Sequence, residues 1–185
     1  SCTTWYNNAR VAPCTKWYKT GVNVELIGRL VARKQEAVGW KRVLLAGVGG
    51  CLVIALLALG SSGNQLVLLT AAFGSTCVLI FQMPAAHVAQ PMNVLGGHLV
   101  SAFIGLLGLT FLPVTWWSVA LCTGAAIAAM AALRVTHPPG GAHPITVMTT
   151  GATWWYLLTP IVMGSIAVLI LGWAFHRATR TRYPI

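Results

Sequence analysis

The sequence has almost no acidic residues: Glu25 and Glu36 are the only two, against twelve Lys and Arg. Charged residues make up 8% of the chain, whereas a soluble domain has about 25%. Between Val43 and His176 the only formally charged residue is Arg134. This scarcity of charge excludes an ordinary soluble domain. Together with a hydrophobic content of 57%, it predicts an integral membrane protein.

The twelve Lys and Arg are concentrated outside the apolar region. Eight lie in residues 1–42, three lie after His176, and the last is Arg134. Charges that flank apolar spans are typical of membrane-surface anchors and orientation signals. The net charge of +10 is therefore assigned to a membrane surface, with lipids as partners, and nucleic acid is not predicted as a partner.

Motifs for catalysis and metal binding are also lacking. The five Cys form no CxxC pair, and the spacing of Cys2 and Cys14 permits a disulfide without establishing one. No acidic residue accompanies the His residues, which disfavours both a metal site and a haem held by two His. No nucleophile–base–acid set and no phosphate loop is present. We therefore predict no enzymatic activity, no metal and no cofactor.

Five apolar segments alternate with short breaks. They cover residues 43–60, 66–81, 95–112, 116–133 and 154–175. A span needs roughly 20 residues, so the second segment is either a full thin span or a re-entrant element. Trp residues stand at segment ends, as in an interfacial aromatic belt: Trp40, Trp116, Trp117, Trp154, Trp155 and Trp173. The predicted fold class is all-α, an integral membrane helical bundle of four or five transmembrane segments.

The basic N-terminal region is predicted to lie outside the spans. Residues 1–22 have no clear period and indicate an irregular arm. Residues 23–40 carry a shared apolar helical face, which predicts an interfacial amphipathic helix; the alternative is a helix packed on the domain. The face consists of Val24, Ile27, Val31 and Val38. The predicted divisions are residues 1–42 for arm and helix, 43–176 for the transmembrane domain and 177–185 for a basic tail.

The number of spans decides where the two basic ends lie. Five spans place the N-terminal region and the tail on opposite membrane faces. The positive-inside rule prefers both on one face, which requires an even number. The sequence leaves both arrangements open.

Two Pro-rich breaks, residues 83–94 and 135–145, form a faint internal repeat. Each follows an apolar segment and ends in Ala-X-Pro, and we expect the two to interrupt helix and approach one another. Paired broken segments in matching halves are a sequence sign of a transporter binding site. Small residues at four-residue spacing predict close helix packing in two segments: Gly97, Ser101 and Gly105, and Gly124, Ala128 and Ala132.

Arg134 stands directly before the second break. Its guanidinium presents donors in a rigid fork that suits an anion with two equivalent oxygens, such as nitrite. The alternative is that Arg134 only ends its segment and extends to lipid headgroups. His137 and His143 flank the break, and His87 and His98 occupy the corresponding region of the other half; each can donate to an anion or carry a proton.

Two separated blocks resemble the HPP family of small integral membrane proteins. The first is Thr136–Pro144, which contains His137-Pro138-Pro139. The second is Phe73-Gly74-Ser75 followed by Ala89-Gln90-Pro91-Met92-Asn93 and Gly96-Gly97-His98. The similarity covers roughly residues 40–175. The chain departs from the family pattern at Ala72, where many relatives have Pro, and at Met92, where many have Arg or Trp.

The resemblance implies a transporter or channel for a small anion, with nitrite as the substrate. It implies a chloroplast envelope or bacterial plasma membrane, and a mitochondrial inner membrane is a further expectation. The alternative is a non-transporting membrane subunit, whose partners are further copies of the chain or a larger complex. The predicted binding residues are Arg134, His137, His98, Asn93, Gly96, Gly97, Pro138, Pro139, Gly140, Gly141, His143 and Gln90.

Overall fold

The computed structural model describes residues 28–29, 31–33, 35, 37–62 and 68–185. It divides into two compact units, Ser1–Ala37 and Val38–Ile185. The predicted arm at residues 1–22 lies outside the described residues, as does most of the predicted interfacial helix at residues 23–40.

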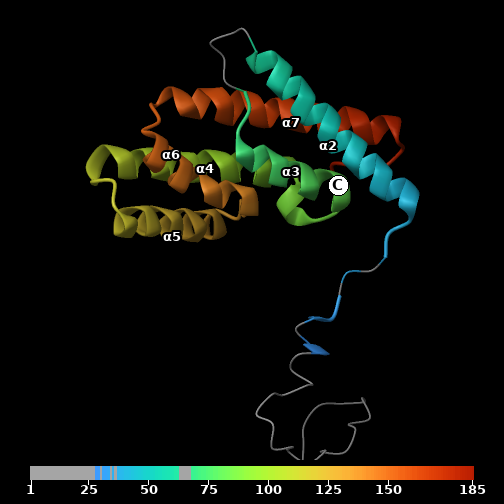
Figure 1. Cartoon of the computed structure of the whole chain (residues 1–185), viewed down its shortest axis with the longest axis horizontal. Coiled ribbons are helices and arrows are strands. Elements are labelled where there is room, and N and C mark those ends of the chain that lie inside the picture. The colour runs from blue at the N-terminus through green and yellow to red at the C-terminus, as the bar shows by residue number, and fades with distance from the viewer. Residues whose placement is uncertain (1–27, 30, 34, 36, 63–67) are drawn as a thin grey trace, which may run out of the picture. The chain divides into compact units, whose positions relative to one another are not determined.

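The second unit is built from helices (Figure 1), and the described residues contain no strand. The long helices are α2 (Trp40–Ser61), α4 (Pro91–Phe111) and α7 (Met163–Ala178), which continues the π-helical turn η3 (Leu157–Val162). The shorter helices are α3 (Ala71–Gln82), α5 (Trp116–Ala132) and α6 (His143–Thr150), and the 3-10 turns are η1 (His87–Ala89) and η2 (Pro138–Ala142).

Three of these helices are long and apolar enough to cross a membrane: Trp40–Ser61, Pro91–Phe111 and Leu157–Ala178. Helices α3 and α5 are apolar but shorter, at 12 and 17 residues. These five elements correspond to the five apolar segments of the sequence. The prediction of an all-α membrane bundle is confirmed.

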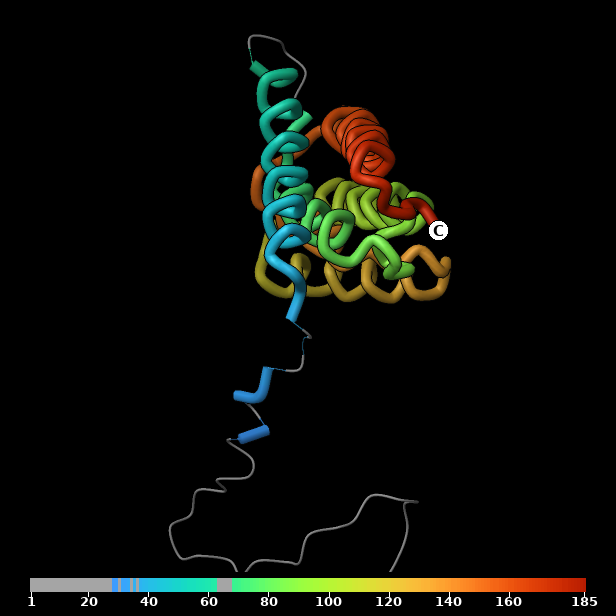
Figure 2. The backbone as a smooth tube through the Cα atoms, turned by 90° about the vertical axis from the view of Figure 1, so that its right-hand side faces the viewer, coloured from blue at the N-terminus to red at the C-terminus, as the bar shows by residue number. Residues whose placement is uncertain are grey.

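Helix α6 is the element that the apolar pattern did not predict. It begins with Pro144 in its first turn, a position that needs no amide donor, and ends at Gly151 in the left-handed conformation with φ 65°. Its residues include three Thr, so its hydropathy is below that of the spans. With α6 the chain returns into the bundle after α5, as the orange segment between α5 and α7 shows (Figures 1 and 2). We call residues 137–150, which comprise η2 and α6, the re-entrant segment.

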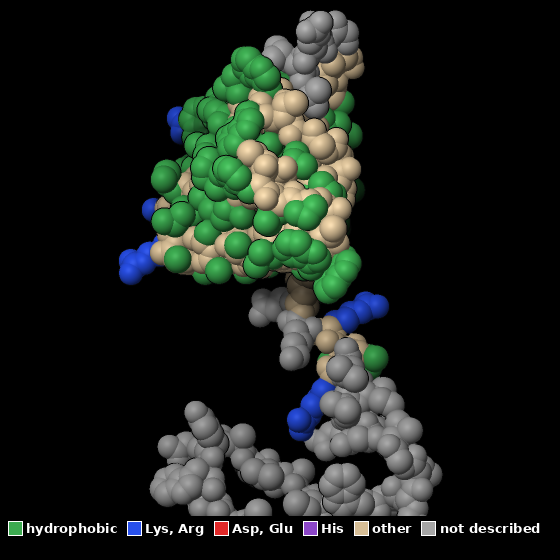
Figure 3. All heavy atoms as spheres, turned by 90° about the vertical axis from the view of Figure 1, so that its left-hand side faces the viewer, with side chains coloured by type: hydrophobic (Ala, Val, Ile, Leu, Met, Phe, Trp, Pro, Cys, Tyr) green, Lys and Arg blue, Asp and Glu red, His purple; other side chains and the backbone are tan. Residues whose placement is uncertain are grey.

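The return through α6 places the start of α2 and the end of α7 at the same end of the bundle (Figure 1). Lys41 and Arg42 stand at the start of α2, Arg134 follows α5, and three Arg follow Phe175. The opposite end shows hydrophobic and uncharged atoms, with Lys and Arg only at the margin of the bundle (Figure 3). Among the described residues, the cations at the start of α2 and those after α7 therefore lie at one end of the bundle, which is the arrangement that the positive-inside rule prefers. We call the end with these cations the basic end.

The small residues of α4 receive the re-entrant segment. Gly97, Ser101 and Gly105 are buried. A Cβ on Gly105 would stand 2.8 Å from Pro144 Cα, and a Cβ on Gly97 would stand 2.5 Å from His137 Cβ. The predicted close packing of this stripe is confirmed.

The corresponding prediction for α5 is wrong. Gly124, Ala128 and Ala132 are exposed, and nothing lies within 4 Å of a Cβ built on Gly124. The buried face of α5 is instead made by side chains two residues away, on the opposite side of the helix: Ser118, Cys122, Ala126 and Met130. Spacing alone does not show which of two parallel stripes faces the bundle.

Replacing Gly105 with Ala should lower the thermal stability of the purified protein in detergent. The added methyl meets the Pro144 backbone, and overpacking of this kind costs roughly 1–3 kcal/mol. The control is Gly124→Ala, which adds the same methyl to open space. Equal melting temperatures for the two variants would contradict the close packing of α4 on the re-entrant segment.

Candidate functional site

The two Pro-rich breaks meet at the basic end of the bundle. His137 Nδ1 donates to the Val88 carbonyl oxygen at 2.7 Å, and Asn93 Nδ2 donates to the Thr136 carbonyl oxygen at 3.1 Å. The expected approach of the breaks is confirmed. The interruptions are shorter than predicted, because helix α4 already begins at Pro91 and α6 at His143. Proline stabilises the first turn of both helices by its fixed φ.

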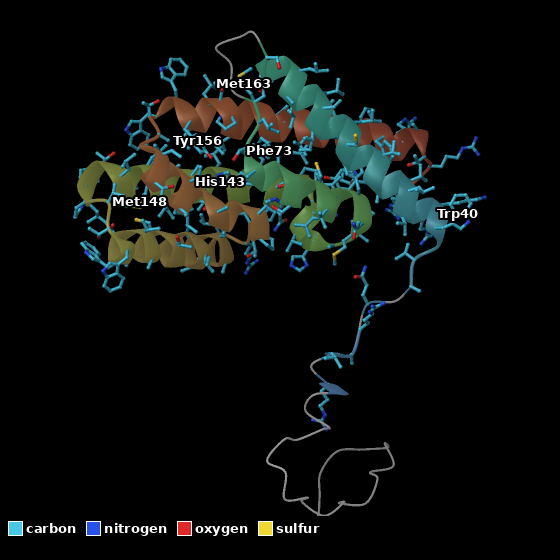
Figure 4. All side chains as sticks on the ribbon, in the orientation of Figure 1. Trp40, Phe73, His143, Met148, Tyr156 and Met163 are labelled. Carbon is cyan, nitrogen blue, oxygen red and sulfur yellow. The ribbon has the colours of Figure 1, made fainter. Side chains whose placement is uncertain are left out.

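Three His side chains from these breaks converge in the interior. His98 comes from α4, His137 precedes η2, and His143, which Figure 4 labels, begins α6. Each has 0% of its surface exposed. The His98 ring centroid lies 4.7 Å from that of His137 and 4.9 Å from that of His143. Phe73 closes one side with its ring edge-on to His98 at 5.2 Å.

Hydrogen bonds link the three His to Thr76 of α3 and to Tyr156. Tyr156 Oη lies 3.1 Å from His143 Nδ1, and His143 Nε2 lies 2.7 Å from His98 Nδ1. Thr76 Oγ1 then lies 2.9 Å from His98 Nε2 and 3.0 Å from His137 Nε2. We call these five side chains the histidine network: Thr76, His98, His137, His143 and Tyr156.

Counting protons assigns one direction to every bond in the network when all three His are neutral. The Val88 oxygen can only accept, so His137 carries its proton on Nδ1 and accepts at Nε2 from the Thr76 hydroxyl. Thr76 then accepts from His98 Nε2–H, and His98 Nδ1 accepts from His143 Nε2–H. His143 Nδ1 accepts from the Tyr156 hydroxyl. All ring nitrogens are satisfied without a charge.

A cavity of about 770 Å³ lies beside the Tyr156 end of the network. Tyr156 belongs to its wall and is half-buried, and the Thr70 side chain hydrogen-bonds Tyr156 from the same wall. Hydroxyl groups dominate the polar part of the lining: Thr70, Thr146, Thr150, Thr153, Tyr156 and Thr159. The network therefore begins at a partly polar cavity and ends at the loop of η1.

The family model described as HPP, transmembrane region, matches residues 35–184. The chain belongs to the HPP family. Two curated transmembrane proteins of Dictyostelium discoideum are similar to it: one is 33% identical and the other 31% identical, each over 160 residues. The alignments cover 81% of this chain and 51% and 55% of the relatives, so the chain spans about half their length. No solved structure matches.

In this HPP-family protein three glycines of the predicted site pack against neighbouring parts of the fold, Gly97 and Gly140 against backbone and Gly96 against a side chain. Gly140 lies against the Gly97 carbonyl, its own oxygen accepts from Ser101 Oγ at 2.6 Å, and Gly96 lies against Val135. Pro139 is buried beside them, whereas Pro138 is exposed and Gly141 half-buried. The close approach expected for a ligand is used here to seat the re-entrant segment on α4.

The predicted residues at the basic end form a second group. Arg134 is exposed, with φ 59° in the turn after α5. Gln90 Nε2 donates to the Pro84 and Ala86 carbonyl oxygens, and Gln90 Oε1 accepts from the Ile185 amide. The C-terminal tail is thereby fastened to η1, which Tyr183 reinforces by donating to the Ala89 carbonyl at 2.9 Å. Burial raises the pKa of the Tyr183 phenol to about 12, so it remains a donor at neutral pH.

Sequence reasoning missed Thr76 and Tyr156. His87, which the sequence places in the same region as His98, is exposed and outside the network. Thr76 shares the buried face of α3 with Phe73 and Ile80, so a lone hydroxyl on an apolar helix face was the available signal. Within the described part of the chain, no group of three or more His, Cys, Asp or Glu could hold a metal ion.

Replacing His98 with Ala should destabilise the protein far more than replacing His87 with Ala. His98 bonds both Thr76 and His143, so its loss leaves buried polar atoms unpaired and opens a cavity, together roughly 2–5 kcal/mol. His87 is exposed, and its substitution should stay within about 0.5 kcal/mol. Thermal melts of the two variants in the same detergent measure the difference. A small, equal effect of both would mean that the network does not hold the interior together.

Proposed function

We propose that this protein transports a small anion across the membrane, with nitrite as the candidate substrate. The observation that carries the proposal is the meeting of three fully buried His at two broken helical segments. Polar and ionisable groups inside a membrane domain are costly and mark substrate, ion or proton pathways. Irregular backbone at such depth lines a cavity or is buried in protein, and it is typical of transporter sites.

The basic end supplies the positive charge that an approaching anion requires. Arg134 and Asn93 both lie there, next to the junction of the breaks, and Arg134 is exposed to the medium. Because Arg134 is exposed, its attraction for an anion at 4 Å is about 1 kcal/mol rather than the several kcal/mol of a buried pair. We infer that Arg134 gathers anions at the entrance and that binding further inside depends on other groups.

A second candidate function is a non-transporting subunit of a membrane assembly. The exposed small residues of α5 favour it, since such stripes allow a second helix to approach closely in lipid. Helix α2 is also the least buried of the three long helices. Flux in liposomes that contain only this protein distinguishes the two functions, because a subunit without transport activity gives none.

Replacing Arg134 with Gln should reduce the initial rate of nitrite flux into liposomes about fivefold at about 0.1 M ionic strength, the factor that corresponds to roughly 1 kcal/mol. Arg134→Lys should retain most of the rate, because the charge at an exposed position remains. The reduction should shrink near 1 M salt, where the screening length is about 3 Å.

The matched control is Lys41→Gln, which removes one exposed charge at the start of α2, a helix that packs on α3 and α7. It should transport at the wild-type rate. If both variants lose the same fraction of flux, Arg134 acts only through total charge. If the wild type shows no nitrite flux, the subunit function replaces transport.

A further inference from the structure

We propose that the histidine network is a proton relay between the cavity beside Tyr156 and the loop of η1. Its coupling to an anion rests on the proposed function, whereas the relay itself does not. Three features of the network support the relay: an unbroken series of short hydrogen bonds, a single direction shared by those bonds, and ends that lie in different parts of the bundle.

The series of bonds contains no gap. From Tyr156 to Val88 there are five contacts, and their distances are 3.1, 2.7, 2.9, 3.0 and 2.7 Å. Each lies within ordinary hydrogen-bond length, so a proton moves by a fraction of an ångström at each of the four contacts from Tyr156 to His137 Nε2, whereas the fifth contact holds the His137 Nδ1 proton on the Val88 carbonyl oxygen. In the neutral network every donor points from Tyr156 toward Val88, which is the order a relay needs.

The transfer conserves protons at every atom. A proton from water in the cavity binds Tyr156 Oη as the original hydroxyl proton passes to His143 Nδ1. The Nε2 proton of His143 passes to His98 Nδ1, and the Nε2 proton of His98 passes to Thr76 Oγ1. The former Thr76 proton passes to His137 Nε2. His137 then carries two protons and one positive charge. It becomes neutral again when its Nδ1 proton breaks the hydrogen bond to the Val88 carbonyl oxygen and passes to a water molecule that enters at the loop of η1, because His137 itself is fully buried.

After one transfer His98, His137 and His143 each carry their proton on the opposite nitrogen, so a second proton follows only after the three rings have regained their first tautomers. Thr76 supplies one part of this reset, the turn of the hydroxyl between His98 and His137. Its hydroxyl also lies 3.1 Å from the Ala72 carbonyl oxygen, an acceptor within the same helix. Rotation toward Ala72 releases His137 Nε2, and rotation back restores the link. The hydroxyl thus has two satisfied orientations, and neither leaves it unpaired in the interior.

The ends of the network lie at different depths. His137 packs at Gly97, near the start of α4 at the basic end, whereas Pro144, next to His143, packs at Gly105. Eight residues of helix separate these two levels by about 12 Å. Beyond His143, Tyr156 and the cavity continue toward the end where α6 joins α7. The relay therefore connects the level of Gly97 at the basic end with the cavity beside Tyr156.

No carboxylate competes for this role, because the sequence from Val38 to Ile185 contains neither Asp nor Glu. The groups that face the network from the packed elements are Phe73 from α3, which is apolar, and Ser101 from α4, whose hydroxyl is committed to Gly140. Arg134 is exposed at the basic end. Among the described residues His176 is a further buried His, and it bonds the Ile80 carbonyl at the α3–α7 contact, separate from the network.

The test is proton flux into liposomes that hold a trapped pH-sensitive dye, driven by a potassium diffusion potential in nitrite-free buffer. Wild-type protein should acidify the lumen. Thr76→Val keeps the shape of the side chain but removes the hydroxyl that joins His98 to His137, and it should reduce the rate at least tenfold. Thr76→Ser restores the hydroxyl and should restore the flux. Tyr156→Phe should also reduce the flux, since it removes the entry group at the cavity wall.

Thr123→Val is the matched control for Thr76→Val. Thr123 bonds the carbonyl four residues earlier at 2.8 Å, as Thr76 does, but it lies on α5 outside the network. It should conduct protons at the wild-type rate. Thermal melts confirm that each variant is folded; should Thr76→Val not fold, the comparison of Tyr156→Phe with wild type decides.

The outcomes separate the two proposals. Nitrite flux without proton flux overturns the relay and retains anion transport. Proton flux without nitrite flux retains the relay and rejects anion transport. Equal proton flux through wild type, Thr76→Val and Tyr156→Phe means that protons cross by another path, and the relay is then wrong.

Discussion

The backbone contact between α4 and the re-entrant segment is the constraint on which the rest of the structure depends. Gly97 and Gly105 let His137 and Pro144 approach α4 to distances that a methyl group would prevent. Ser101, between them, donates to the Gly140 carbonyl oxygen, which also accepts from the His143 amide, and so ties the 3-10 turn to α4. In lipid no water satisfies exposed backbone, so a short helix and its turn are stable at this depth only when seated in this way. The same contact turns the chain back through the bundle, so that the start of α2 and the end of α7 lie at the same end.

That contact also explains how three His can be buried without charge. Seating the re-entrant segment on α4 brings His137 and His143 to opposite sides of His98, close enough for each nitrogen to find a partner. An unpaired polar group in such an interior costs roughly 1–3 kcal/mol, so a half-satisfied network would be worse than apolar packing. Complete satisfaction requires the hydroxyls of Thr76 and Tyr156 as well. The network is therefore as much a condition of the fold as a candidate pathway.

The sequence predicted the parts of this arrangement that follow from composition and local chemistry. The lengths of the apolar segments predicted five helical elements, and the Pro and Gly residues predicted both breaks. The four-residue spacing of small residues identified the buried stripe of α4. It did not predict α6, because eight residues with three Thr carry no span signal. Nor did it predict Thr76 or Tyr156. Thr76 bonds His residues that lie 22 and 61 positions further along the chain, and Tyr156 bonds His143 of α6, a helix that the apolar pattern did not predict. Periodicity reports one helix face at a time, and such partnerships need the tertiary fold.

The distribution of charge separates two tasks: the attraction of an anion from the medium and the stabilisation of an anion inside the bundle. A single fixed cation would otherwise have to perform both. Arg134 is exposed at the basic end, so it acts on an anion in the medium and not on one inside the bundle. From Val43 to Val135 the sequence contains no Lys or Arg apart from Arg134, so an anion inside the bundle would meet no fixed positive charge. An unpaired ion in a low-dielectric site is costly in free energy. A proton held by the histidine network places a positive charge at that depth only while it is needed. A neutral network that accepts one proton would thus stabilise a crossing anion and release it when the proton leaves, whereas a buried Arg would hold it.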